Sequence, residues 1–218
     1  MRYAVLGTGT VGETIAGKLV ELGNEVMMGS RRAGNEKALA WAEAAGDGAS
    51  EGSFEDAASF AEALVNATAG VASLDALAAA GAGNLAGKVV IDLANPLQPD
   101  SGMPPELAFC NTESLGERIQ DAFPDARVVK TLNTINAAVM VDPASVPDSH
   151  NVFVSGNDAA AKSQVTELLE SFGWPADAVI DLGDISTARG AEMYLALWLR
   201  LMLAGGSARF NIRVVRGD

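Results

Sequence analysis

The chain has 218 residues, of which 49% are hydrophobic and 20% are charged, and this composition suits a compact fold with its own core and excludes a disordered chain. The formal net charge is −13, so the protein repels a phosphate backbone and no nucleic-acid partner is expected. A single cysteine and a single histidine cannot form an internal disulfide or a multi-histidine metal site, so we expect a cytoplasmic protein without a metal.

Short apolar, β-rich runs alternate with segments of helical periodicity along almost the whole chain. Strands are expected at residues 2–6, 25–28, 64–68, 89–93, 127–132, 152–155 and 179–182. Helices are expected at residues 11–22, 36–45, 54–63, 74–80, 115–123, 159–172 and 187–204. Because this alternation is typical of βαβ units, the sequence predicts an α/β fold with a Rossmann-like, doubly wound and mainly parallel sheet.

Two connections are long for a compact domain, at residues 94–111 and 133–151, and loops of this size are often functional. We place a division near residue 150, with a dinucleotide-binding Rossmann domain at 1–150 and a small C-terminal α/β portion at 151–218. That portion is expected to close the site or to contact a second subunit. The longest apolar stretch, residues 193–206, is shorter than a membrane span, so no membrane association is expected.

The helix expected at residues 115–123 has a recognisable start. Ser114 precedes it and Glu117 follows three residues later, which is the spacing of a capping box. In such a box each of the two side chains accepts a hydrogen bond from a backbone N–H at the helix start.

A glycine-rich loop gives the strongest functional signal. The sequence Gly7-Thr8-Gly9-Thr10-Val11-Gly12 directly follows the first expected strand and opens the first expected helix. In this context Gly7 supplies a tight turn, Gly9 lets a pyrophosphate approach the backbone, and Gly12 lets helix and strand pack closely. The helix N-terminus then offers N–H groups and a positive dipole end to the anion, so the loop predicts dinucleotide binding.

The end of the second strand selects between the two nicotinamide dinucleotides. An NAD site carries Asp or Glu here for the ribose 2′-hydroxyl, whereas Arg accommodates a 2′-phosphate. This chain reads Ser30-Arg31-Arg32 at that point. We therefore expect NADP, with the Ser30 hydroxyl donating to the 2′-phosphate and the two guanidinium groups pairing with it or stacking on the adenine.

These motifs, together with Asp92-Leu93-Ala94-Asn95-Pro96-Leu97 and Lys130-Thr131-Leu132-Asn133-Thr134, resemble the NADPH-dependent reductases of the deazaflavin coenzyme F420. The sequence is also similar to the related reductase domain of STEAP-type metalloreductases, over roughly residues 1 to 190. The resemblance implies a Rossmann-like domain, a frequent dimer, and hydride transfer between NADP and coenzyme F420 as substrate.

The resemblance also implies a set of cofactor contacts. The residues expected to hold NADP are Gly7, Thr8, Gly9, Thr10, Val11, Gly12, Ser30, Arg31 and Arg32. Those expected to border the nicotinamide are Asn95, Pro96, Asn133 and Ala137. Thr68 and Ala69, at the end of the strand expected at 64–68, are also expected to bind the cofactor. Asn95 and Asn133 are possible orienters of the nicotinamide carboxamide, because a side-chain amide carries both a donor and an acceptor.

The chain offers few acid or base catalysts. Hydride transfer between two stacked rings needs the reacting carbons held about 3–3.5 Å apart and no proton donor. No Tyr-x-x-x-Lys pair is present, since Gly7 and Trp198 stand four residues after the only tyrosines. His150 reads as a loop residue and Lys130 as one partner of a structural ion pair, although either could contact a substrate.

The last expected helix carries Tyr194, Leu197, Trp198, Leu201 and Met202 at helical spacing. Such a face is typical of core packing or of a dimer contact, so a homodimer through this helix is expected. A sharper alternative makes Trp198 a stacking wall for a planar acceptor.

Two other functions stay open on the sequence. One is an imine or keto-acid reductase of the pyrroline-carboxylate reductase or 3-hydroxyacid type, which shares the N-terminal half but normally needs a proton donor. The other is a non-catalytic NADP-binding module that reports the redox state to a partner protein.

Overall fold

A computed structural model describes residues 1–98 and 100–217 of the chain. Within these residues an eight-stranded sheet has the order β3-β2-β1-β4-β5-β6-β7-β8. The strands are β1 Arg2–Leu6, β2 Glu25–Ser30, β3 Ala49–Ser53, β4 Ala63–Asn66, β5 Val89–Asp92, β6 Arg127–Thr131, β7 Val152–Gly156 and β8 Val179–Gly183. Neighbouring strands run parallel except β6 and β7, which are antiparallel. This confirms the doubly wound α/β fold.

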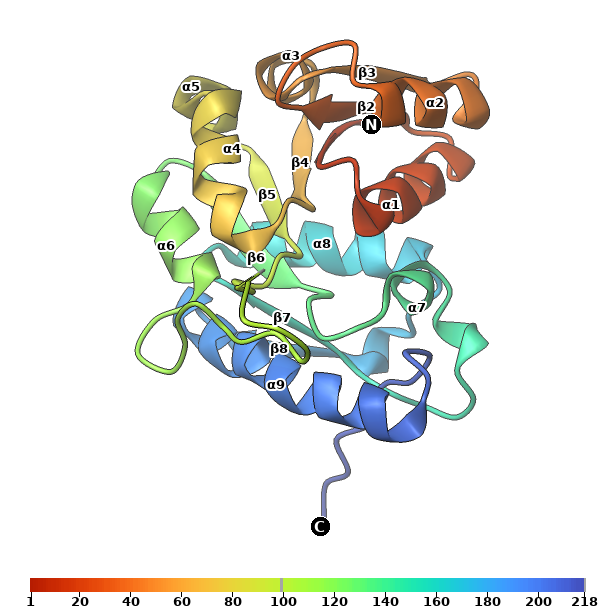
Figure 1. Ribbon diagram of the computed structural model, residues 1–218, viewed down its shortest axis with the longest axis vertical. Coiled ribbons are helices and arrows are strands. Elements are labelled where there is room, and N and C mark those ends of the chain that lie inside the picture. Colours follow the sequence, from red (N-terminus) through yellow and green to blue (C-terminus); the bar gives the residue numbers. More distant parts are fainter. Residues whose placement is uncertain (99, 218) are drawn as a thin grey trace.

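Helices cover both faces of the sheet (Figure 1). They are α1 Thr10–Glu21, α2 Glu36–Ala45, α3 Phe54–Phe60, α4 Ser73–Ala80, α5 Ala82–Leu85, α6 Leu115–Ala122, α7 Ala137–Val141, α8 Ala159–Ser171 and α9 Ala188–Gly205. One face is packed by α1, α2, α7 and α8, and the other by α3, α4, α5, α6 and the start of α9. The strands alternate their apolar side chains between these two layers, as a sheet buried on both faces requires.

The expected elements are confirmed, with shifts of at most three residues at their ends. The helix expected to reach residue 63 ends at Phe60, because Ala61 is extended and Ala63 already begins β4. The strand expected to reach residue 68 ends at Asn66, which leaves Thr68 in a loop. The sequence did not predict β3, α5 or α7: β3 has little apolar alternation and is held by its pairing with β2.

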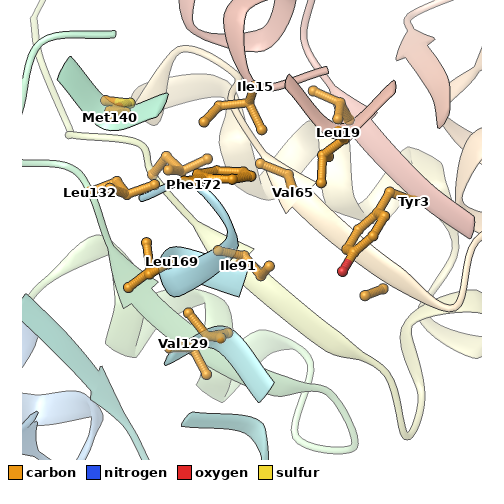
Figure 2. Packing of buried hydrophobic residues seen from close by; sticks show 14 of the residues in the cluster. Tyr3, Ile15, Leu19, Val65, Ile91, Val129, Leu132, Met140, Leu169 and Phe172 are labelled. Carbon is orange, nitrogen blue, oxygen red and sulfur yellow. The ribbon is translucent and has the colours of Figure 1, made fainter. Parts of the chain in front are cut away.

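The larger core layer fills the space between the sheet, α1 and α8. Figure 2 shows Ile15 and Leu19 of α1 near Val65 and Ile91 of the central strands, with Phe172 at the end of α8 in the same cluster. These side chains are almost fully buried. Their burial fixes α1 against β1 and β4, and so fixes the loop from which α1 begins.

The long connection after β5 crosses to the C-terminal helix. Leu97 and Leu107 form an isolated antiparallel bridge. Both side chains pack against a small cluster around Trp198 of α9. The segment between β5 and α6 is therefore held between the sheet edge and α9.

The expected capping box at α6 is only half formed. Ser114 Oγ accepts a hydrogen bond from Glu117 N at 3.1 Å. The Glu117 carboxylate accepts hydrogen bonds from the Ser114 hydroxyl and from Arg189 of α9, and not from the Ser114 N–H. Arg189 Nε lies 2.8 Å from Glu117 Oε2. The hydrogen bond from Arg189 lowers the pKa of the Glu117 carboxyl below its usual range. This ion pair joins α6 to α9.

The variant Glu117→Gln should lower the free energy of unfolding at pH 7 by roughly 0.5–1 kcal/mol, as for a partly exposed pair. Because the folded-state pKa is depressed, the stabilisation is complete above the unfolded pKa of about 4.3 and is lost as the pH falls through the folded-state pKa. Urea unfolding of both proteins between pH 7 and pH 4 measures the difference. A difference that does not shrink toward pH 4 would show that the contact is not ionic.

Candidate functional site

The three glycines of the loop after β1 differ in the space around them. Gly7 has φ +119°, and a Cβ there would lie 2.5 Å from Ala67 O. A Cβ at Gly12 would lie 2.1 Å from Gly7 O, so helix and loop are in direct contact. A Cβ at Gly9 would meet nothing within 4 Å. The loop is therefore closed at Gly7 and Gly12 and open to a ligand at Gly9.

The start of α1 offers backbone donors to that open space. Gly9 is the N-cap and has no side chain to cap the helix, while its carbonyl accepts the first helical bond from Glu13 N at 2.9 Å. The N–H groups of the first turn and the positive end of the helix dipole together form an anion site. These residues fit the pyrophosphate of a dinucleotide.

The loop after β2 presents two cationic side chains. Ser30 is buried, and its Oγ donates to Arg32 O at 2.6 Å, which shapes the turn. Arg31 and Arg32 are exposed, and within the described part of the chain neither pairs with a carboxylate. Glu51 of β3 accepts from Gly34 N with both oxygens, at 3.0 and 3.1 Å, and holds the far side of the loop.

A cavity of about 660 Å³ adjoins α1 at the carboxyl ends of β4 and β5. Its lining comprises Val11, the turn Ala67, Thr68, Ala69, Gly70 and Val71, the segment Leu93, Ala94 and Asn95, and Leu97, Gln98, Gly102, Met103 and Pro105. None of these described side chains titrates. The site is mostly apolar, with Thr68, Asn95 and Gln98 as its polar side chains.

The turn after β4 is fixed from beneath by a polar network. Thr68 Oγ1 donates to Asn66 Oδ1 at 2.7 Å, and Asn66 Nδ2 donates to Asp92 Oδ1 at 2.8 Å and to Ser73 Oγ at 3.0 Å. A Cβ at Gly70 would lie 2.0 Å from Asn95 O, so the turn touches the loop after β5 directly. Thr68 and Ala69 are thus held at the cavity wall.

Two asparagines join the loops after β5 and β6. Asn95 Nδ2 donates to Asn133 O at 2.8 Å, and Asn133 Nδ2 donates to Asn95 Oδ1 at 3.0 Å. Leu132, just before Asn133, is buried with φ +59°, a left-handed backbone that is unusual for leucine. Such strain is commonly found where surrounding structure fixes a functional loop.

The expected nicotinamide contacts are only partly brought together. Thr68, Ala69 and Asn95 line the cavity, whereas Pro96, Asn133 and Ala137 are buried and lie outside its lining. Asn133 reaches the site through Asn95. Ala137 begins α7, which packs against α1.

A buried charge cluster lies behind the cavity. Lys130 Nζ is 2.8 Å from Asp92 Oδ2 and 2.8 Å from Glu192 Oε1, and all three side chains are at most 2% exposed. Burial by itself lowers the pKa of Lys130, but the two carboxylates outweigh it and the pKa is raised. The expected ion pair of Lys130 is confirmed, and a charged lysine outside the cavity lining is no proton donor to a bound substrate.

The sequence did not identify Glu192 as part of this cluster. Its carboxylate also accepts from Leu115 N at 2.8 Å and from Gly116 N at 3.1 Å, which caps the start of α6. An acidic residue in an apolar helix suggests a buried partner, but the partners of Glu192 are distant in sequence and could not be identified from it. From the sequence, Asp92 could be identified only as a polar residue at the end of a strand.

Three other residues singled out in the sequence lie away from the cavity. His150 Nε2 bonds Pro143 O at 3.0 Å, and its Nδ1 is 2.9 Å from Asn211 Nδ2, so it ties the C-terminal segment to a loop. Trp198 stacks on Phe210 at 5.3 Å between ring centroids and does not line the cavity, which corrects its alternative role as a wall for an acceptor. Cys110 is exposed.

In the described residues, every helix is too short or too polar to cross a lipid bilayer. Within the same residues, no cluster of three His, Cys, Asp or Glu side chains has the arrangement of a metal site.

Comparison with known proteins identifies relatives along the whole chain. Residues 2–96 match the model of the family described as NADP oxidoreductase, coenzyme F420-dependent. A crystal structure from Arthrobacter sp. FB24, provisionally assigned as an F420-dependent NADP-reductase, superposes with a TM-score of 0.92 at 54% identity, covering 98% of this chain and 99% of that chain. A hypothetical protein from Sinorhizobium meliloti superposes with a TM-score of 0.69 at 25% identity, covering 87% of this chain and 88% of that one.

The metalloreductase STEAP3 of Rattus norvegicus is 28% identical over 206 residues. The match includes 92% of this chain but only 37% of the length of that curated relative. The family match at the glycine loop and the 54% identity over a full-length neighbour agree with the site geometry. The chain therefore belongs to the coenzyme F420-dependent NADP oxidoreductase family and is an NADP-dependent oxidoreductase.

Proposed function

We propose that this oxidoreductase transfers a hydride between NADP(H) and the deazaflavin coenzyme F420. One observation carries the proposal: the cavity beside the glycine loop has an apolar lining in which no described side chain titrates. Such a site can position two rings but cannot supply a proton. The family description and the provisional assignment of the Arthrobacter neighbour support the same acceptor.

In this proposal the loop Gly7-Thr8-Gly9-Thr10-Val11-Gly12 binds the pyrophosphate through the N–H groups at the start of α1. The open space at Gly9 supports it. Ser30, Arg31 and Arg32 bind the 2′-phosphate of NADP: the two guanidinium groups are exposed beside the end of β2, and the Ser30 hydroxyl turns from Arg32 O to the phosphate.

The nicotinamide half lies in the cavity, against Thr68, Ala69 and Asn95, with Pro96, Asn133 and Ala137 behind them. Asn95 and Asn133 each use one N–H on the other residue. Asn95 keeps a further donor that can orient the carboxamide, and Asn133 holds the Asn95 side chain in place.

The bound nicotinamide supplies the hydride. The chain holds the ring against the cavity wall, fixes its carboxamide and excludes water through the apolar lining. Reduction of an imine or keto acid would need a general acid, and the described lining contains none. The geometry therefore favours an acceptor that takes a hydride into a conjugated ring, which spreads the negative charge until solvent supplies the balancing proton.

We also propose a homodimer through α9, with residues 1–150 binding the dinucleotide and residues 151–218 forming the subunit contact. Met193, Leu197 and Leu201 are 41%, 55% and 41% exposed and recur every four residues. They form an apolar stripe on the outer face of α9, and a contiguous stripe of this kind commonly marks an interface.

Mixing the protein with NADPH and oxidised coenzyme F420 should bleach the deazaflavin absorbance, and NADH should give a much slower reaction. The cavity is expected to position the nicotinamide and deazaflavin rings for transfer, and the Ser30-Arg31-Arg32 loop is expected to select the 2′-phosphate of NADPH. Tight NADPH binding without bleaching would overturn the acceptor and direct the search to imines and flavins.

The preference for NADPH over NADH can be tested separately. Replacing the loop as Ser30→Asp/Arg31→Ala/Arg32→Ala removes two charge-assisted contacts and should shift the ratio of NADPH to NADH affinity by about 100-fold or more toward NADH. An unchanged ratio in a folded variant would contradict the 2′-phosphate assignment.

Two glycine variants should separate folding from binding. Gly9→Ala adds a methyl group to open space at an ordinary φ of −92°, so thermal stability should stay unchanged while the NADPH Kd rises by on the order of tenfold. Gly12→Ala forces a contact with Gly7 O and should lower stability by roughly 1–3 kcal/mol. Calorimetry and fluorescence titration measure the two effects, and equal NADPH affinity in Gly9→Ala would contradict the placement of the pyrophosphate.

Sedimentation should show a dimer for the wild-type protein and a folded monomer for Leu197→Glu. The substitution puts a charge in the centre of the apolar stripe, and because Leu197 is 55% exposed it leaves the subunit core intact. The exposed Leu39→Glu of α2 is the matched control and should remain dimeric. A wild-type monomer, or a dimer in Leu197→Glu, would contradict this interface.

A further inference from the structure

The backbone of Ala94 is held on both sides by buried charges. Ala94 N donates to Asp92 Oδ1 at 3.2 Å, and Lys130 Nζ donates to Ala94 O. Ala94 lines the cavity, and its neighbour Asn95 is joined to Asn133 in turn. The cavity wall after β5 is thus attached to a charge cluster that does not itself reach the cavity.

All three N–H donors of the Lys130 ammonium group have partners. A lysine has three N–H donors, and here they face Asp92 Oδ2, Glu192 Oε1 and Ala94 O. The side chain is 1% exposed, so no water competes for these positions. Because two carboxylates favour the protonated amine, Lys130 has all three donors available for these contacts.

A buried ion cluster contributes little net stability, because the cost of desolvating the charges offsets much of their attraction. Apolar side chains often replace such clusters without loss of stability. Lys130 nevertheless directs one donor at a loop carbonyl in the cavity wall. That arrangement gives the loop a defined position, which apolar packing alone specifies less sharply.

We propose that Lys130 is a positioning residue for the nicotinamide half of the site: it fixes the Ala94 peptide and thereby places Asn95 for the carboxamide. This inference rests on the proposed placement of the nicotinamide in the cavity. The adenosine half, held by the glycine loop and by Arg31 and Arg32, does not contact this loop and should be indifferent to Lys130.

The test compares two ligands and two variants. Adenosine 2′,5′-bisphosphate probes the adenosine half alone, and NADPH probes both halves. Lys130→Met/Glu192→Gln removes the donor to Ala94 O while keeping the buried net charge at −1, as in the wild type. Glu192→Gln alone is the matched control, because it perturbs the same helix contact but leaves Lys130 bonded to Asp92 and Ala94.

The double variant should raise the Kd for NADPH about tenfold, the effect of one lost hydrogen bond in the site, with the Kd for adenosine 2′,5′-bisphosphate within about twofold of wild type. Glu192→Gln should leave the ratio of the two Kd values unchanged. A merely structural role would lower the folded fraction but would not change that ratio. An unchanged ratio in the folded double variant overturns the proposal.

If the double variant does not fold, the uncharged variant Asp92→Asn/Lys130→Met/Glu192→Gln decides. It has no buried charge to desolvate and keeps an acceptor for Ala94 N, so the same tenfold rise in the NADPH Kd is expected, and an unchanged ratio again overturns the role of Lys130. Wild-type protein that binds adenosine 2′,5′-bisphosphate but gains nothing from the nicotinamide half would instead refute the proposed function itself.

Discussion

The ammonium group of Lys130, enclosed by Asp92 and Glu192, is the interaction on which the site's architecture depends. It joins β5 and β6 near the carboxyl ends of these strands. Glu192 of α9 contacts the same ammonium group and also accepts hydrogen bonds from the backbone N–H groups at the start of α6. Three charges removed from water are tolerable only because nearly every lone pair and N–H finds a partner. Loss of Lys130 would leave two carboxylates without a cation in the interior.

The topology of the sheet explains why the residues of the candidate site converge. In a parallel sheet the carboxyl ends of neighbouring strands meet at one edge, and β1, β2, β4 and β5 all end there. The glycine loop, the arginine loop and the cavity wall each follow one of these strands. Close contacts such as that of Gly70 with Asn95 O then fix adjacent loops against one another.

Sequence reasoning located features whose cause is local. The glycine loop and the Ser30-Arg31-Arg32 turn depend on a few consecutive residues, and both lie where the sequence places them. The ion pair of Lys130 followed from a lysine in an apolar strand, but Glu192 did not, because only tertiary packing brings α9 to β6. For the same reason the sequence did not show that Asn133 bonds Asn95 and lies outside the cavity lining.

The antiparallel attachment of β7 has an evolutionary consequence. Because β7 and β8 run opposite to β6, their carboxyl ends lie at the sheet edge away from the cofactor cavity. The turn after β7 can therefore accept insertions without displacing the cavity lining, whereas the turn after β8 leads into α9, whose Glu192 contacts Lys130. New surface can thus be added after β7 without changing the residues that line the cavity.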